Sequence, residues 1–281
     1  MKYTLLIYFY ILSISAYSQI NSEKEIVSRM LNASENLHTA KYSFHTEELL
    51  VNGSFEITDR LVKLQAKPKN IYFYSQKPNP GTEIIWKEGW KENKMLVSPG
   101  SFPFVTFTMK PTSSLARKNS HHSIVEMGFN YMNSLVVHYQ KAYGDKFYDY
   151  CSIVDTVQWD GRSCIRFEFD FKDYSVIKYT VRKNENVSSI AKKLFLNDYS
   201  ILILNHSISD YDDVKEGQVI KIPNSYGKKI EFYIDRFSWL PIRQQIFNSN
   251  GLYEKYEIKS LFVNPKFKDE EFTPEYKEYK F

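Results

Sequence analysis

Apolar and polar residues alternate along most of the chain, as they do in strands that are buried on one face. Between residues 40 and 107 short clusters of turn-forming residues interrupt this alternation and divide it into strand-like segments. These clusters are Asn52-Gly53, Lys67-Pro68, Pro78 to Gly81 and Pro99-Gly100. Alternation returns near Tyr148 and continues, with one interruption, to about Val263. The pattern predicts consecutive antiparallel strands of one sheet.

Two segments show helical spacing instead. Ser22 and Glu25 form a capping box before an apolar helical stripe, which predicts a helix over residues 22–38. A second helix is predicted over residues 120–142, with Ile124, Met127, Tyr131, Leu135 and His138 on one stripe. The order helix, strands, helix, strands predicts an α+β fold. We expect a strongly curved antiparallel sheet, a half-barrel, with covering helices.

The stretch from Lys178 to Asn205 breaks the alternation that surrounds it. Ile190, Ala191 and Leu194 fall on one helical face, and the run from Leu202 to Leu204 predicts a short buried second helix. Strand-like segments resume directly after this stretch. We therefore expect a small unit inserted into the connection between two neighbouring strands, with the sheet continuing across it.

Composition narrows the classes of partner. The chain has 281 residues, 16% of them aromatic, and a net charge of +4. We find no basic stripe with interleaved aromatic residues of the kind that a nucleic-acid groove needs. The sequence therefore predicts no nucleic-acid partner.

The N-terminal segment has the three-part layout of a secretory signal peptide. Lys2 precedes an apolar run from about Leu5 to Ile14, and the small residues Ser15, Ala16 and Ser18 follow it. The run is too short for a comfortable membrane span, and no later stretch approaches the length of one. We expect residues 1–18 to be a signal peptide and the mature chain to be exported, without a transmembrane segment.

Export permits a disulfide, and the chain contains Cys151 and Cys164. Asp160-Gly161 predicts a two-residue hairpin turn. A regular hairpin places Cys164 opposite Val157 and leaves Cys151 roughly 20 Å away, beyond bridging distance. Two reduced thiols are then expected, whereas a loop that folds back would allow the two cysteines to pair.

Two motifs near the C-terminal end of the large unit carry a family resemblance. Asp235 precedes Leu240-Pro241 with the spacing Asp-x-x-x-x-Leu-Pro, and a closing motif follows. That closing motif consists of Asn264, Pro265, Phe267, Asp269 and Phe272. These features resemble the periplasmic lipoprotein-carrier fold of the LolA/LolB type. The resemblance implies a curved sheet whose apolar cavity holds a lipid or lipoprotein-like ligand.

A middle motif is more similar still to a bacterial family of exported domains of unknown function. It consists of Arg117, His121, His122, Ser123, Gly128 and Phe129. The two resemblances together cover about residues 21–177 and 226–281. We therefore expect one discontinuous carrier-like domain, residues 19–177 and 226–281.

The inserted stretch, residues 178–225, resembles a LysM module with strand–helix–helix–strand (βααβ) order. The resemblance implies binding of N-acetylglucosamine glycans such as peptidoglycan or chitin-like polymers. It places Asn184, Glu185, Asn186 and Val187 on one wall of a shallow groove, and His206, Ser207, Ile208 and Ser209 on the other. Asn184 stands where the family usually has Gly, and Glu185 where it has Asp. Because Asn tolerates positive φ, we expect the turn to survive.

No catalytic constellation is recognisable. His121 and His122 are adjacent and would point about 100° apart on a helix, so they do not form a zinc-binding pair. Motifs for a metalloprotease, a serine hydrolase and a phosphate loop are missing from the sequence. We expect no catalytic residue, no metal and no cofactor. Arg117, His121 and His122 are expected either to cap and pack a helix end or to contact a ligand at the cavity mouth.

Two functions follow from this reading. The first is a non-enzymatic protein of the periplasm or cell envelope of a Gram-negative-type bacterium, which binds peptidoglycan through LysM and holds a lipid or lipoprotein-like ligand. The alternative is an envelope enzyme, or its accessory, that LysM delivers to peptidoglycan. The aromatic strands predict an apolar cavity, and the helix over residues 120–142 serves either as its lid or as its filling.

Overall fold

The computed structural model describes residues 22–281, so the expected signal peptide over residues 1–18 lies outside the described residues. An eleven-stranded sheet forms the body of the molecule, and all its neighbouring strands are antiparallel. Its strands are β1 Thr39–Leu49, β2 Phe55–Gln65, β3 Asn70–Lys77, β4 Glu83–Lys87, β5 Met95–Ser98, β6 Phe107–Met109, β7 Cys151–Trp159, β8 Arg162–Asp170, β11 Lys229–Asp235, β12 Pro241–Asn248 and β13 Gly251–Val263. The strand order is β6-β5-β4-β3-β2-β1-β13-β12-β11-β8-β7. The predicted α+β class and the antiparallel sheet are confirmed.

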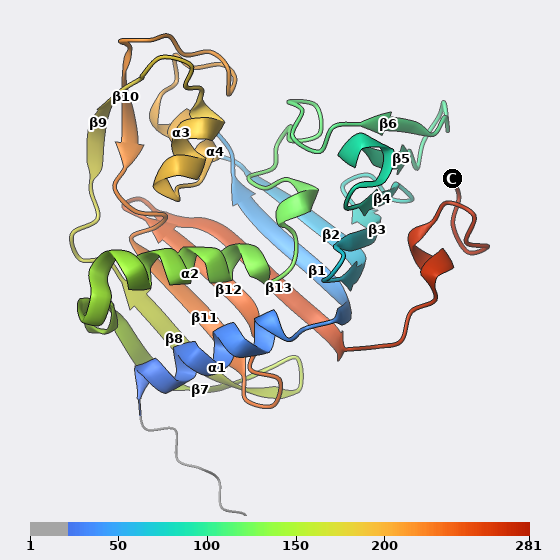
Figure 1. Cartoon of the computed structure of the whole chain (residues 1–281), viewed down its shortest axis with the longest axis horizontal. Coiled ribbons are helices and arrows are strands. Elements are labelled where there is room, and N and C mark those ends of the chain that lie inside the picture. The colour runs from blue at the N-terminus through green and yellow to red at the C-terminus, as the bar shows by residue number, and fades with distance from the viewer. Residues whose placement is uncertain (1–21) are drawn as a thin grey trace, which may run out of the picture.

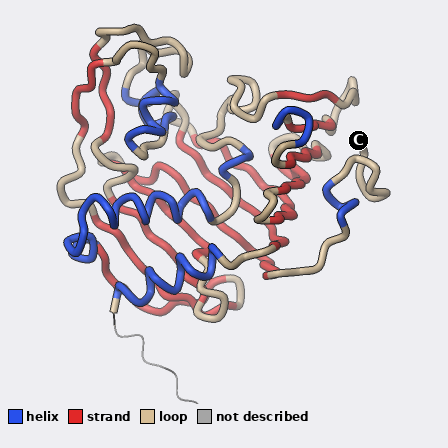
Figure 2. The backbone as a smooth tube through the Cα atoms, viewed as in Figure 1, coloured by secondary structure: helices blue, strands red, loops and turns tan. Residues whose placement is uncertain are grey.

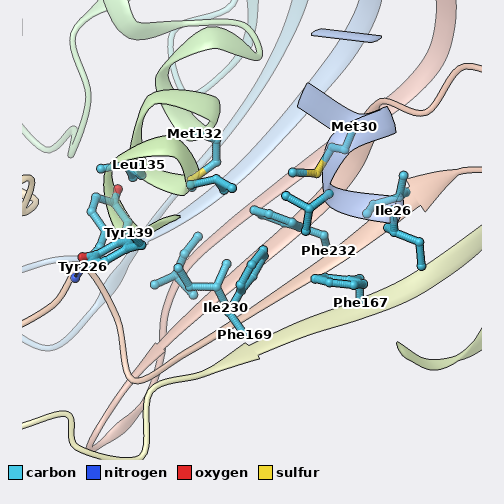
Figure 3. Packing of buried hydrophobic residues seen from close by; sticks show 14 of the residues in the cluster. Ile26, Met30, Met132, Leu135, Tyr139, Phe167, Phe169, Tyr226, Ile230 and Phe232 are labelled. Atoms are coloured by element: carbon cyan, nitrogen blue, oxygen red, sulfur yellow. Dashed lines mark hydrogen bonds between the residues drawn. The ribbon is translucent and has the colours of Figure 1, made fainter. Parts of the chain in front are cut away.

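Two helices, α1 (Glu23–Glu35) and α2 (Asn130–Tyr143), cross the same face of this sheet (Figures 1 and 2). The Ser22 hydroxyl caps α1 by accepting a hydrogen bond from the Glu25 N–H at 3.3 Å, as the capping motif predicts. Both helices pack against β8 and β11 (Figure 3). The residues that meet there include Ile26 and Met30 of α1, Met132 and Leu135 of α2, and Phe167, Phe169 and Phe232 of the sheet. This packing forms one large core cluster.

The second helix begins later than the predicted residue 120. Gly128 has φ +99°, a conformation that side-chain-bearing residues rarely adopt, and it separates the short 3-10 helix Ile124–Glu126 from α2. The buried stripe of α2 is also shifted, because Met132, Leu135, Val136 and Tyr139 face the core. His138 lies off this stripe and stacks on Phe195, with ring centroids 3.8 Å apart.

The hairpin of β7 and β8 turns at Asp160-Gly161, as predicted. Val157 lies opposite Cys164 and Trp159 opposite Arg162. Cys151 lies opposite Phe169, well along the strand, and both cysteines are free thiols. The expectation of two reduced thiols is therefore confirmed.

A small unit interrupts the chain between β8 and β11. It consists of β9 Val176–Thr180, α3 Val187–Leu194, α4 Asp198–Leu204 and β10 Val219–Pro223, with β9 and β10 paired in their own two-stranded sheet. β8 and β11 pair directly, with Asp170 opposite Lys229. The predicted strand–helix–helix–strand order of the small unit is confirmed, and the large sheet continues from β8 to β11.

Short 3-10 helices occur in the remaining parts of the chain. Three further 3-10 helices, Trp90–Asn93, Gly144–Tyr150 and Asp269–Phe272, connect or close the sheet. Phe272 packs with Tyr72 and Ile85, so the C-terminal segment covers part of β3 and β4. Within residues 22–281 no helix has the length and hydropathy to cross a membrane.

Candidate functional site

A cavity of about 320 Å³ lies between the large sheet and the segment from Pro111 to Met132. Strand alternation positions its floor, because side chains two residues apart on a strand face the same side of a sheet. The floor includes Tyr42, Phe44, Thr46 and Glu48 of β1, and Glu56, Thr58 and Arg60 of β2. Its volume is at the lower end of the range typical of ligand pockets.

The cavity is graded from apolar to polar along these strands. Phe44 lies opposite Arg60, Thr46 opposite Thr58, and Glu48 opposite Glu56. Beyond Phe44 the lining is mainly apolar and includes Phe73, Ile84, Met95 and Ile258. Toward the β1–β2 turn the lining consists of acidic side chains and of side chains that carry hydroxyl groups. An elongated ligand with one apolar and one polar end matches this gradient.

His122 contributes to the polar end of the lining. Its Nδ1 lies 3.1 Å from Glu126 Oε2, and its Nε2 lies 3.0 Å from the Tyr226 hydroxyl. Burial alone would lower the pKa of His122, but the carboxylates of Glu126 and Glu254 outweigh it and raise this pKa well above its usual value. These two carboxylates therefore favour the charged form of the imidazole.

Glu254 of β13 is the centre of the polar network behind His122. Its carboxylate is fully buried and lies 2.8 Å from His121 Nδ1. It also accepts hydrogen bonds from Asn197 Nδ2 at 2.7 Å and from the Tyr226 hydroxyl at 3.0 Å. Burial would raise the pKa of Glu254, but hydrogen bonds from His121 and His122 lower it to about 2. This carboxylate is therefore ionised, and both of its oxygens have hydrogen-bond partners.

Asn197 brings the inserted unit into the same network. Its side-chain oxygen caps α4 by accepting from the Tyr199 N–H at 2.8 Å, while its amide donates to Glu254. The Tyr253 hydroxyl donates to the same oxygen at 3.1 Å. The start of α4 is therefore fixed to β13 by buried hydrogen bonds.

Arg117 makes the second link to the inserted unit. Its guanidinium donates to both carboxylate oxygens of Asp198, at 2.6 and 2.7 Å, and to the His121 carbonyl at 2.8 Å. The same group stacks over the Tyr211 ring, 4.5 Å from its centroid. Only 7% of Arg117 is exposed, so this fork of hydrogen bonds is shielded from water.

His121 completes the interface. Its ring lies between Tyr199 of α4 and Tyr253 of β13, with centroid distances of 4.4 and 4.6 Å. Its Nε2 lies 2.7 Å from the Leu49 carbonyl. The ring therefore touches the inserted unit and two strands of the large sheet.

The structure thus divides the residues expected at the cavity mouth. His122 lines the cavity, whereas Arg117 and His121 contact the inserted unit and are not among the lining residues within 22–281. The sequence alone does not indicate a role for Asn197, Asp198 or Glu254. Asn197-Asp198 carries a helix-cap signal, but nothing in the local pattern indicates that Glu254 is its partner.

The first expected glycan wall is a well-ordered turn. Asn184 has φ +62°, a conformation that Asn adopts more readily than most other residues with a side chain. The Glu185 carboxylate accepts from the Tyr179 hydroxyl, the Arg182 N–H and Lys193 Nζ. Burial would raise the pKa of Glu185, but these hydrogen bonds lower it to about 2.

The other residues of that wall join it to the opposite segment. Asn186 caps α3 through the Ser189 N–H at 2.8 Å and donates to Asp212 at 2.7 Å. Val187 is buried, and its N–H donates to the Tyr211 carbonyl at 2.8 Å. The turn and the segment before β10 are therefore in direct contact.

The second expected wall is more accessible. His206, Ser207 and Ser209 are exposed, whereas Ile208 is only 5% exposed and packs in the core of the inserted unit. The Ser209 N–H and hydroxyl both donate to Asp213. His206 and Ser207 are thus the members of this wall whose side chains are open to a ligand.

Comparisons with known proteins match two parts of the chain. Residues 38–186 match the family described as protein of unknown function (DUF1571), and residues 179–223 match the LysM domain. None of the curated proteins matches the chain.

Solved structures with a similar course of the chain include LprF from Mycobacterium bovis, at 11% identity and a TM-score of 0.42, covering 87% of this chain and 94% of that one. LppX from Mycobacterium tuberculosis has 11% identity and a TM-score of 0.40, covering 88% of this chain and 99% of that one. A LolA superfamily protein from Nitrosomonas europaea has 8% identity and a TM-score of 0.34, covering 90% of this chain and 98% of that one. Because the family match spans more than half of the 281 residues, the chain belongs to the DUF1571 family of proteins of unknown function and carries a LysM domain.

Proposed function

We propose that this chain is an exported, non-enzymatic binding protein of the bacterial cell envelope. Its LysM domain holds a peptidoglycan or chitin-like glycan, and its large domain holds a lipid or lipoprotein-like ligand. In this proposal the large sheet is a strongly curved half-barrel, and α2 with the segment before it acts as a lid. The observation that carries the proposal is the graded cavity of about 320 Å³ beneath that segment.

The apolar end of the cavity supplies affinity for a hydrocarbon chain. Phe44, Phe73 and Met95 line this end. Burial of hydrocarbon stabilises a complex by about 0.8 kcal/mol per methylene. A chain of several methylenes therefore offsets part of the entropy that association costs.

In this proposal the LysM domain determines where in the cell envelope the protein is held. The accessible side chains of His206 and Ser207, together with the polar turn at Asn184, suit hydrogen bonding to N-acetyl and hydroxyl groups of a sugar. The domain is fixed beside the polar end of the cavity through the Asn197–Glu254 hydrogen bond. A glycan held by LysM would therefore keep the cavity near the cell wall, in the periplasm or elsewhere in the envelope.

Two measurements test the cavity function. Protein purified from its native envelope should carry an extractable lipid that mass spectrometry identifies. The delipidated protein should bind a fluorescent fatty acid saturably. Absence of both would leave a packed scaffold and overturn the carrier proposal.

A cavity-filling variant sharpens this test. Ile84→Trp places a larger side chain on the lining and should weaken probe binding. Val154→Trp, on the exposed edge strand β7 away from the cavity, is the matched control and should bind the probe like the parent. Equal binding by all three proteins would locate the probe elsewhere.

A cell-wall assay tests the remaining part. The full chain should sediment with insoluble peptidoglycan and release neither sugars nor peptides from it. Release of either product would favour the alternative, an envelope enzyme that LysM targets to its substrate.

A further inference from the structure

Arg60 is a cationic side chain in the cavity wall, and no residue within 22–281 forms a hydrogen bond or an ion pair with it. It comes from β2, faces the cavity and is half-buried. Its guanidinium lies over the Phe73 ring, 5.3 Å from the centroid. Among residues 22–281 no group accepts a hydrogen bond from this guanidinium, and no carboxylate forms an ion pair with it.

The acid that acts most strongly on Arg60 through its charge is already engaged. Glu48 accepts from the Tyr256 hydroxyl at 2.8 Å and from the His121 N–H at 3.1 Å. It therefore attracts the guanidinium at a distance without supplying a hydrogen bond. An arginine carries five N–H donors and stays charged in proteins, so the half-buried guanidinium of Arg60 has donors to offer to a ligand in the cavity.

The position of Arg60 matches the head of an amphiphile. Its cross-strand neighbour is Phe44, and Phe73 lies beneath its guanidinium. Glu56 lies on the same face of β2 but four residues away, about 13 Å along the strand. Arg60 is thus the first charged group that a hydrocarbon chain would meet on leaving the apolar end.

We propose that Arg60 binds the anionic group, a carboxylate or a phosphate, of an amphiphile whose hydrocarbon chain lies against Phe44 and Phe73. Planar guanidinium groups suit both anions, because they donate two parallel hydrogen bonds to either. This inference rests on the proposed lipid-binding function and specifies the head group of its ligand.

A head-group series on the delipidated full chain tests the inference apart from the function. Palmitate, hexadecyl phosphate, hexadecanol and hexadecylamine share one chain length and should displace a neutral fluorescent lipid probe. We expect palmitate or hexadecyl phosphate to bind at least about tenfold more tightly than hexadecanol, since hydrogen bonds to a charged group contribute about that much. The tighter of the two identifies carboxylate or phosphate as the preferred anion.

Variants assign the preference to Arg60. Arg60→Gln should remove the preference for anionic ligands while hexadecanol still binds, which also shows that the variant folds. Arg60→Lys should keep much of the preference. Arg166→Gln is the matched control, because Arg166 on β8 pairs with Asp155 outside the cavity lining. It should leave the whole series unchanged.

The outcomes separate the two proposals. If none of the four ligands binds, the lipid-binding function fails. If hexadecanol binds as tightly as the anions, or hexadecylamine binds more tightly, the function stands and the role of Arg60 is overturned. The parent protein alone decides these cases, so the test does not depend on the stability of Arg60→Gln.

Discussion

Arg117 of the large domain and Asp198 of the LysM domain form a two-pronged ion pair, with N–O distances of 2.6 and 2.7 Å. Asp198 is the first residue of α4, and Arg117 lies in the loop before the 3-10 helix Ile124–Glu126. Both side chains are largely shielded from water, at 8% and 12% exposure. The LysM domain is therefore docked onto its host through a buried charge pair as well as joined to it by the chain.

Removing one partner of this pair should be strongly destabilising. Asp198→Asn leaves the Arg117 charge shielded and unpaired, and we expect the free energy of unfolding to fall by about 3 kcal/mol. Denaturant titration measures the change. Asp155→Asn breaks a geometrically similar Arg–Asp pair, with Arg166, that is partly exposed, and should cost less than about 1 kcal/mol. Equal losses in the two variants would contradict a buried interface.

Stability should fall in mild acid because of Glu254. Its folded-state pKa of about 2 is lower than the value near 4.3 expected in the unfolded chain. Its contribution is therefore complete above about pH 5 and is lost as the pH falls toward 2. Glu254→Gln should reduce the slope of unfolding free energy against pH in this window. An unchanged slope would show that Glu254 is not held as an ion in the folded protein.

His122 should act in the opposite direction. Its folded-state pKa is raised, so its contribution is complete below its unfolded pKa of about 6.5 and is lost as the pH rises through the folded value. The groups that face it are Glu126, Glu254 and Tyr226. His122→Gln should flatten the loss of stability above about pH 7. Titration of the His122 ring by NMR gives the same answer directly, and a pKa near or below the usual value would contradict it.

The sequence predicts the features that depend on residues close together in the chain. The Ser22 cap, the Asp160-Gly161 turn and the insertion between β8 and β11 all follow from short-range signals. The sequence does not indicate the true start of α2, because helical spacing near Ile124 hides the effect of Gly128, whose positive φ breaks the helix.

Contacts between residues far apart in the chain cannot be predicted from the local sequence pattern. The sequence shows that Glu254 and Arg60 lie in strand-like segments, but not which face of each strand is covered. Glu254 is satisfied by Asn197, a residue of a different domain, while Arg60 faces the cavity. The His121 ring likewise contacts Tyr199 of the inserted unit and Tyr253 of β13, and His122 contacts the hydroxyl of Tyr226, which is far away in the sequence.

Deleting residues 178–225 and joining the ends with a short turn tests the domain boundary. The host should fold, because β8 and β11 pair directly at Asp170 and Lys229. It should unfold at a lower denaturant concentration than the full chain, since Glu254 loses Asn197 and Arg117 loses Asp198. Non-cooperative unfolding of the deletion variant would show that the boundary is wrong.

The glycan prediction is best tested at exposed positions of the LysM domain. Asn186 caps α3 and Ile208 is buried, so substitutions there would confuse loss of binding with loss of structure. Ser207→Trp instead adds bulk to an exposed side chain in the expected groove and should weaken binding to sedimented peptidoglycan about tenfold, the equivalent of about 1.4 kcal/mol. Lys215→Trp, at an exposed position outside the expected groove residues, is the matched control and should sediment like the parent. If both variants sediment equally well, the glycan lies elsewhere, and sedimentation by the deletion variant would assign it to the large domain.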